Sequence, residues 1–169
     1  MQLTIRDAQP SDARRFEEIR VGGWKTAYAH IIDPSVLETL QVTEERIALW
    51  RERIAEAGPH DVTLTAELDD EVVGLAVLRP SRDDDVPEAA ELLALYIDPV
   101  RRSGGVGTAL MTAGFARMPH EVQTLWTLEG NAAARRFYER HGFVADGASK
   151  PLDVVGQPTE IRYRRTRLG

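Results

Sequence analysis

The sequence predicts one soluble domain of mixed α/β class built around a central sheet, and three observations predict it. The chain has 169 residues, a length typical of one domain and sufficient to bury one core. Apolar residues make up 43% and charged residues 28%, the balance of an ordinary globular protein. Strand-type and helix-type stretches follow in the order β-α-α-α-β-β-β-α-β-α-β-β, with no linker or repeat. We therefore expect residues 1–169 to form a single domain.

Each element is predicted from its periodicity and its ends. Strands show alternating or continuous apolar runs, and helices show apolar residues three and four positions apart. Helix starts are marked by capping residues, namely Ser11 or Asp12 for the first helix and Asn131 for the last, and by Pro34 in a first turn. The helix that follows Gly104 is apolar nearly all round, which predicts burial. In order, we expect a strand at 3–7, helices at 11–27, 34–40 and 43–58, strands at 61–67, 71–78 and 91–97, a helix at 104–118, a strand at 122–128, a helix at 131–141, and strands from 143 and at 161–166, with a loop at 149–158.

Composition excludes several classes of protein. The chain has no cysteine, which removes disulfide frameworks and thiol nucleophiles, and its four histidines stand far apart, so we expect no metal. A net charge of −6 argues against nucleic-acid binding. The longest uncharged stretch, 103–116, is too short to span a bilayer, and the first residues lack a signal-type apolar run. We expect a cytoplasmic protein with no membrane or nucleic-acid partner.

Charge is unevenly distributed along the chain. Residues 61–100 hold eleven acidic side chains against Arg79 and Arg82, and residues 150–169 hold five basic ones against Asp153 and Glu160. One interpretation is an acidic, soluble surface beside a basic final strand. The other is an acidic rim that attracts cationic ligands by long-range steering.

A glycine-rich turn, Arg101-Arg102-Ser103-Gly104-Gly105-Val106-Gly107-Thr108, stands between an expected strand and a buried helix. Such a turn presents backbone N–H groups at the positive end of a helix dipole, which is suited to phosphate. No lysine follows the glycines as in a Walker A loop, and Leu110 replaces the third glycine of a dinucleotide fingerprint. The alternative is a helix start that needs glycine only for close packing.

Two motifs carry a resemblance to a known family. Arg102-x-x-Gly105-x-Gly107 resembles the pyrophosphate signature of the GNAT N-acetyltransferase superfamily. The later segment Asn131-x-x-Ala134-x-x-Phe137-Tyr138-x-x-x-Gly142-Phe143 is similar to the second motif of that superfamily. The run Trp24-x-x-x-Tyr28, followed by Ile31-Ile32-Asp33-Pro34, resembles a common bacterial branch. The resemblance covers residues 3–166 and is tightest over 91–143.

The resemblance implies a fold and a co-substrate. The fold would be a mostly antiparallel mixed sheet of about six or seven strands, splayed between the fourth and fifth strands and flanked by about four or five helices. Acetyl-CoA would be the acetyl donor, its pantetheine arm bonding to the backbone of Leu95 and Ile97 like an added strand. The N–H near Leu95 would also stabilise the oxyanion of the thioester. The implied cofactor-binding residues are Leu95, Tyr96, Ile97, Arg102, Ser103, Gly104, Gly105, Val106, Gly107, Thr108, Asn131, Ala134 and Tyr138.

The same resemblance implies two candidate catalytic residues. An alkyl ammonium is not a nucleophile at neutral pH, so a base must remove a proton, and the departing thiolate benefits from an acid. Tyr138, on one helix face with Asn131 and Ala134, is the expected acid; alternatively it is a core aromatic. The histone-modifying branch places Glu91 at the position of its general base. Because Glu91 lies about 13 Å along a strand from Leu95, it would act through water or an inward-curling side chain; alternatively it is a solvated carboxylate.

The acceptor is the least defined part of the prediction. Trp24 and Tyr28 lie one helical turn apart and are expected to wall an aromatic slot for a cation, although both are equally suited to core packing. The expected function is N-acetylation of a primary amine of a small molecule or peptide. The alternative is an inactive acetyl-CoA-binding sensor. Family analogy alone suggests a homodimer.

Overall fold

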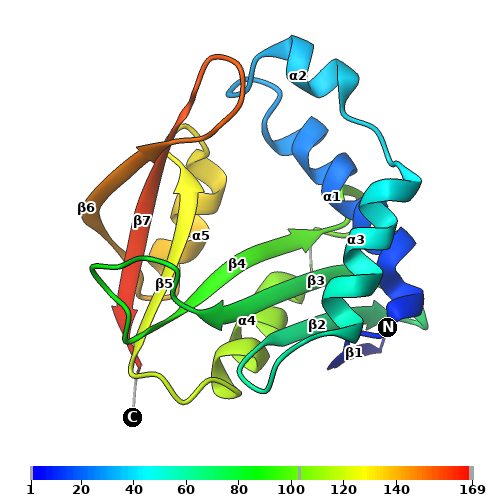
Figure 1. The fold of residues 1–169 in the computed structure, drawn as a ribbon, viewed down its shortest axis with the longest axis horizontal. Helices are drawn as coiled ribbons and strands as arrows, with labels where there is room; N and C mark the ends of the chain where they lie inside the picture. Colours follow the sequence, from blue (N-terminus) through cyan, green and yellow to red (C-terminus); the bar gives the residue numbers. More distant parts are fainter. Residues whose placement is uncertain (1, 103, 168–169) are drawn as a thin grey trace.

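The computed structural model describes residues 2–102 and 104–167, and its centre is a seven-stranded sheet of order β1-β2-β3-β4-β5-β7-β6 (Figure 1). Every neighbouring pair is antiparallel except β4 and β5, which are parallel. This confirms the predicted fold class. The strands are β1 (Leu3–Asp7), β2 (Val62–Leu68), β3 (Glu71–Pro80), β4 (Ala89–Ile97), β5 (Val122–Leu128), β6 (Val144–Pro151) and β7 (Thr159–Thr166).

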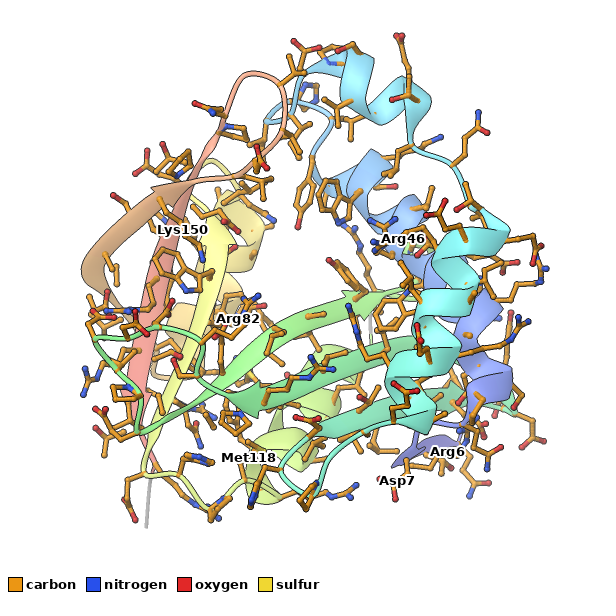
Figure 2. The ribbon with its side chains drawn as sticks, viewed as in Figure 1. Arg6, Asp7, Arg46, Arg82, Met118 and Lys150 are labelled. Carbon is orange, nitrogen blue, oxygen red and sulfur yellow. The ribbon has the colours of Figure 1, made fainter. Side chains whose placement is uncertain are left out.

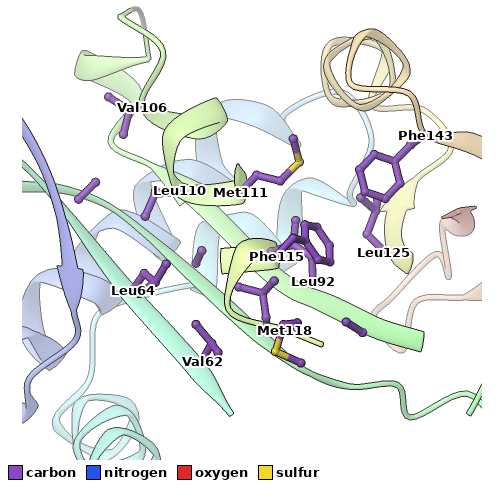
Figure 3. Close-up of a cluster of buried hydrophobic side chains, with 14 of the residues drawn as sticks. Val62, Leu64, Leu92, Val106, Leu110, Met111, Phe115, Met118, Leu125 and Phe143 are labelled. Carbon is purple, nitrogen blue, oxygen red and sulfur yellow. The ribbon is translucent and has the colours of Figure 1, made fainter. Parts of the chain in front are cut away.

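The helices cover the two faces of the sheet. On one face, α1 (Ala13–Ala27) and α3 (Glu44–Ala55) bury Phe16, Ile47 and Trp50 against the strands. On the other face, α4 (Val106–Ala116) buries Leu110 and Phe115 in the largest apolar cluster (Figure 3). The remaining elements are α5 (Ala132–Arg140), α2 (Pro34–Thr39) and two short 3₁₀ turns at Pro10–Asp12 and Pro99–Arg101. No helix of the described chain is long and apolar enough to cross a membrane.

The predicted splay lies between β4 and β5. These strands pair only where Ala89–Leu92 faces Val122–Leu125, and beyond that point they diverge (Figure 1). A third apolar cluster bridges the open end, because Ile32 and Leu37 from the α1–α2 region pack with Leu128 of β5 and Leu152 of the β6–β7 loop. The splay therefore opens into a space enclosed by elements from both halves of the chain.

A bulge in β4 sets which side chains face this space. The register between β3 and β4 shifts at Val77/Leu78, which leaves Leu93 as an extra residue. Before the bulge, Ala90 and Leu92 pack on the α4 side; after it, Leu95 and Ile97 pack there. Even-numbered residues therefore face α4 before the bulge, and odd-numbered residues face α4 after it.

Several element ends differ from the sequence prediction. Helix α1 begins at Ala13, because Ser11 lies in the preceding 3₁₀ turn, and neither Ser11 nor the N-cap residue Asp12 caps the helix with its side chain. Helix α4 begins at Val106 rather than Gly104, because Gly104 and Gly105 have φ of 101° and 76° and cannot extend a right-handed helix. Helix α3 ends at Ala55 rather than at 58. Strand β6 continues to Pro151, so the loop that follows covers only 152–158.

Part of the acidic segment pairs with the basic final strand. Arg162 of β7, 5% exposed, donates to Asp85 at 2.7 and 2.8 Å and to Asp146 at 2.6 Å, and it also approaches Asp83. Trp126 Nε1 donates to the Asp83 carboxylate at 2.9 Å. The acidic loop after β3 is thus tied to the basic final strand, so these carboxylates are not free to attract a cationic ligand.

Candidate active site

A large cleft occupies the splay. Its volume is about 540 Å³, and it is lined by residues from α1, β4, β5, the start of α4, α5 and β7. The cleft collects most of the residues expected at a site. These are Trp24, Tyr28, Leu95, Tyr96, Ile97, Arg102, Gly105, Val106, Gly107, Thr108, Asn131, Ala134 and Tyr138.

Strand β4 turns a row of backbone groups toward the cleft. The N–H of Asp98 donates to the carbonyl of Val73, which fixes the hydrogen-bonded positions between β3 and β4. Because these positions alternate in an antiparallel pair, Tyr96 bonds to β3 while Leu95 and Ile97 direct their N–H and C=O groups outward. Strand β5 has already diverged there, so it does not take up these groups. An extended ligand with amide groups could pair with them as an added strand.

The glycine-rich turn forms the start of α4. Gly105 is its N-cap, with the left-handed φ of 76°, and no side chain of the described residues caps the helix. The first helical bond runs from the N–H of Ala109 to the carbonyl of Gly105 at 2.9 Å. The N–H groups of Val106, Gly107 and Thr108 are therefore left for a ligand. This positive helix end suits a phosphate group.

Not every residue of the turn lines the cleft. Gly104 is exposed and does not line it, and Ser103 lies outside the described residues. Gly107 has a packing role, because a Cβ at this position would lie 3.4 Å from the ring of Phe137 on α5. A side chain at position 107 would therefore contact Phe137, whereas Gly105 is favoured by its left-handed backbone conformation.

Helix α5 supplies the opposite wall. The side chain of Asn131 accepts a hydrogen bond from the N–H of Ala134 at 3.2 Å, which confirms the predicted cap. Asn131, Ala134 and Tyr138 all line the cleft from one face of this helix. Burial raises the pKa of the Tyr138 hydroxyl, so that it stays protonated throughout the neutral range. A protonated phenol at this position can donate a proton to a leaving group.

The aromatic pair at the end of α1 reaches the same cleft. Trp24 and Tyr28 pack edge to face with centroids 5.2 Å apart, and Trp24 Nε1 donates to the hydroxyl of Tyr96 at 3.3 Å. The guanidinium of Arg20 already lies 5.7 Å from the centroid of the Trp24 ring. The predicted core packing is confirmed. The rings also line the cleft, and their role in holding a cation stays a prediction.

Glu91 is not brought to the cleft. Its side chain is 1% exposed, and its carboxylate accepts hydrogen bonds from the guanidinium of Arg82 at 2.7 Å and from the N–H of Arg82 at 3.1 Å. The bulge at Leu93 places Glu91 on the opposite face of β4 from Leu95. Figure 2 shows Arg82 near the divergence of β4 and β5. The alternative of a solvated carboxylate is wrong, because Glu91 is buried and ion-paired; its role as a base stays a prediction.

Among the cleft residues that were not predicted from the sequence, two are charged and one is a tryptophan. Trp126 of β5, Arg140 at the end of α5 and Glu160 of β7 all line the cleft. Arg140 lies within the second motif, where a basic residue near a phosphate site could have been noticed. Glu160 is one of two acidic residues in the otherwise basic segment 150–169, and this contrast could have drawn attention to it. Nothing local marks Trp126.

Comparisons with known proteins agree with this geometry. The sequence model of the family described as "Acetyltransferase (GNAT) family" matches residues 25–143, which is more than half of the chain. The chain therefore belongs to the GNAT family of acetyltransferases.

Individual relatives share moderate sequence identity with this chain. A probable N-acetyltransferase of Mycobacterium tuberculosis is 28% identical over 98% of this chain and 94% of its own length. A mycothiol acetyltransferase of Sanguibacter keddieii is 38% identical over 47% of this chain and 27% of its own length. Both relatives are named as acetyltransferases, in agreement with the family assignment.

Solved structures share the fold. The PaiA N-acetyltransferase of Thermoplasma acidophilum, in complex with coenzyme A, matches with a TM-score of 0.73 at 22% identity, over 98% of this chain and 100% of that one. The putative acetyltransferase YncA of Salmonella typhimurium, with its cofactor acetyl-CoA, matches with a TM-score of 0.71 at 19% identity, over 98% and 94%. At this identity the likeness establishes the common fold.

Proposed function

We propose that this protein transfers the acetyl group of acetyl-CoA to a primary amine of a small molecule or peptide, by direct attack of the amine when both substrates are bound. One observation carries the proposal: the uncapped start of α4 and the outward backbone of β4 open into the same cleft. The first suits a diphosphate, and the second suits the amides of a pantetheine arm. The fold shared with structures that contain coenzyme A or acetyl-CoA supports this assignment.

Different residues of the cleft would bind different parts of acetyl-CoA. Val106, Gly107 and Thr108 would donate backbone N–H groups to the diphosphate, with Arg102 adding positive charge. Leu95 and Ile97 would bond to the pantetheine amides. The N–H near Leu95 would also bind the thioester oxygen, where negative charge develops during attack.

Tyr138 would act as the acid. Its raised pKa keeps the proton on the hydroxyl at neutral pH, and the thiolate that departs from the carbonyl carbon needs a proton. A purely acetyl-CoA-binding sensor would have no use for this proton. The presence of Tyr138 in the cleft therefore favours catalysis over sensing.

The test has a binding step and a transfer step. Thermal-shift measurements with acetyl-CoA, ATP and NAD should show stabilisation by acetyl-CoA alone. Release of free thiol is then measured with acetyl-CoA and a panel of primary amines, with the matched alcohols as controls. Stabilisation by ATP or NAD instead of acetyl-CoA would overturn the co-substrate assignment. Binding of acetyl-CoA without thiol release for any amine would overturn the transfer reaction.

A further inference from the structure

Among the described residues that line the cleft, Glu160 is the only carboxylate. It is the second residue of β7, opposite Leu128 of β5 on one side and Lys150 of β6 on the other. Strands on both sides therefore fix its backbone. Because strands on both sides pair with it, Glu160 presents its side chain from the sheet rather than from a loop.

The nearby cations are engaged elsewhere. The ammonium of Lys150 lies 4.0 Å from the centroid of the Trp126 ring, and the guanidinium of Arg82 binds Glu91 at 2.7 Å (both are labelled in Figure 2). The described residues give the Glu160 carboxylate no ion pair within 4.0 Å. Buried carboxylates are normally paired, so a half-buried one without a partner in a substrate cleft is a place for a cation from the ligand.

Four charged or titratable groups act on Glu160 from the surrounding elements. Lys150 of β6 and Arg82 of the loop after β3 favour its ionised form, whereas Glu91 of β4 disfavours it. Tyr28, which ends α1, also lies within electrostatic reach. Burial outweighs these charges and raises the pKa of Glu160 above its ordinary value. The carboxylate is therefore a better proton acceptor than an exposed glutamate.

Tyr28, Tyr138 and Glu160 line the same cleft. Burial raises the pKa of Tyr28, the charges of Tyr96, Tyr138 and Glu160 raise it further, and the charge of Arg102 lowers it. A ligand in this cleft would therefore have both the expected acid and the unpaired carboxylate available to it.

We propose that Glu160 binds the ammonium group of the acceptor and accepts a proton from it, so that the acceptor class is a primary amine that is cationic in solution. This inference rests on the proposed function. The aromatic rings of Trp24 and Tyr28 would flank the bound cation. Glu160, rather than Glu91, would then be the group in direct contact with the acceptor.

The proton balance of the transfer is complete with these residues. The ammonium gives one proton to the Glu160 carboxylate, and the freed lone pair forms the C–N bond with the thioester carbon. The C–S bond breaks with its electrons moving to sulfur, which takes the Tyr138 proton. The second nitrogen proton restores the Tyr138 hydroxyl, and Glu160 releases its proton to water. The products are the amide, the free thiol and one proton.

The test compares Glu160→Gln and Glu160→Asp with Asp153→Asn, which removes one negative charge from an exposed residue of the neighbouring loop outside the cleft. The probes are butylamine, spermidine and lysine amide, with butanol as the uncharged control. The first readout is the carboxyl ¹³C signal of Glu160 in labelled, coenzyme A-bound protein, assigned by its loss in Glu160→Gln. The second readout is the pH profile of thiol release.

We expect an amine probe, but not butanol, to shift the Glu160 signal and lower its pKa. Glu160→Gln should reduce turnover by about 100-fold and remove the acidic limb of the pH profile, with unchanged acetyl-CoA affinity. Glu160→Asp should keep that limb, and Asp153→Asn should behave as wild type. An unshifted signal with every amine, or wild-type turnover and pH profile in Glu160→Gln, would overturn the inference. If an amine shifts the signal but none is acetylated, ammonium binding stands and the proposed function fails.

Discussion

Substitution of Gly105 separates backbone strain from charge at the proposed diphosphate site. Gly105 has φ of 76° at the start of α4, and a Cβ there would meet no atom of the described residues within 4 Å, chain neighbours aside. Alanine, glutamine and glutamate at this position should therefore lose a similar amount of stability, about 1–2 kcal/mol, because each must adopt the left-handed conformation. Only glutamate adds a negative charge.

The charge term can be worked out for the isosteric pair Gly105→Gln and Gly105→Glu. Two like charges 4 Å apart repel by about 1 kcal/mol in water and about 4 kcal/mol at an effective dielectric constant near 20. Against a diphosphate with two charges, the penalty is about 2–8 kcal/mol. The lower limit corresponds to about 30-fold weaker binding. Gly105→Glu should therefore bind acetyl-CoA at least about 30-fold more weakly than Gly105→Gln.

Calorimetric titration with acetyl-CoA at low salt measures this difference, and urea unfolding of each variant checks the shared loss of stability. Added salt should narrow the gap between the two variants, because the repulsion is screened. Equal affinities for Gly105→Glu and Gly105→Gln would refute the assignment of the α4 N-terminus as the diphosphate site. Unequal unfolding free energies would show instead that the variants differ in folding.

Three further predictions follow from other parts of the site. Tyr138→Phe should lower turnover at least about tenfold with little change in acetyl-CoA affinity, measured by thiol release and calorimetry; equal turnover would remove Tyr138 from the reaction. Arg82→Ala should lower the free energy of unfolding in urea by about 3 kcal/mol, because it leaves the buried Glu91 carboxylate unpaired. Glu91→Ala should lower it by only about 1–2 kcal/mol, because Arg82 is 61% exposed and can be solvated. A larger loss for Glu91→Ala than for Arg82→Ala would contradict this. Glu160→Gln should raise the free energy of unfolding at neutral pH, because burial raises the pKa of Glu160 and so disfavours its ionised form in the folded state. This gain in stability should shrink as pH falls through the raised pKa, because the wild-type side chain is then already protonated. A gain independent of pH would point to packing.

The predictable parts of the site are local in sequence. The glycines before α4, the cap at Asn131 and the spacing from Asn131 to Tyr138 each depend on residues within one turn or helix. Left-handed backbone, capping and helix periodicity are decided at that range. For the same reason, the order of strands and helices could be read from the chain with errors only at the ends of elements.

The parts that could not be predicted depend on contacts between distant segments. Two-residue alternation would place Glu91 and Leu95 on the same face of β4, but the extra residue Leu93 reverses that relation. A bulge has no dependable local signal, because it forms in response to the neighbouring strand. Glu160 reaches the cleft because β7 inserts between β5 and β6. That strand order is decided by the whole sheet.

The charged groups that line the cleft come from different elements of the fold. Arg102, Arg140 and the positive end of α4 come from the side formed by α4 and α5, whereas Glu160 comes from β7. The other acidic residues near β7 do not change this division, because Arg162 binds Asp83, Asp85 and Asp146. Under the proposed function, a dianionic diphosphate and a cationic amine would therefore be attracted to different elements of the cleft wall. A chain with a net charge of −6 would thus offer a positive helix end to one substrate and a carboxylate to the other.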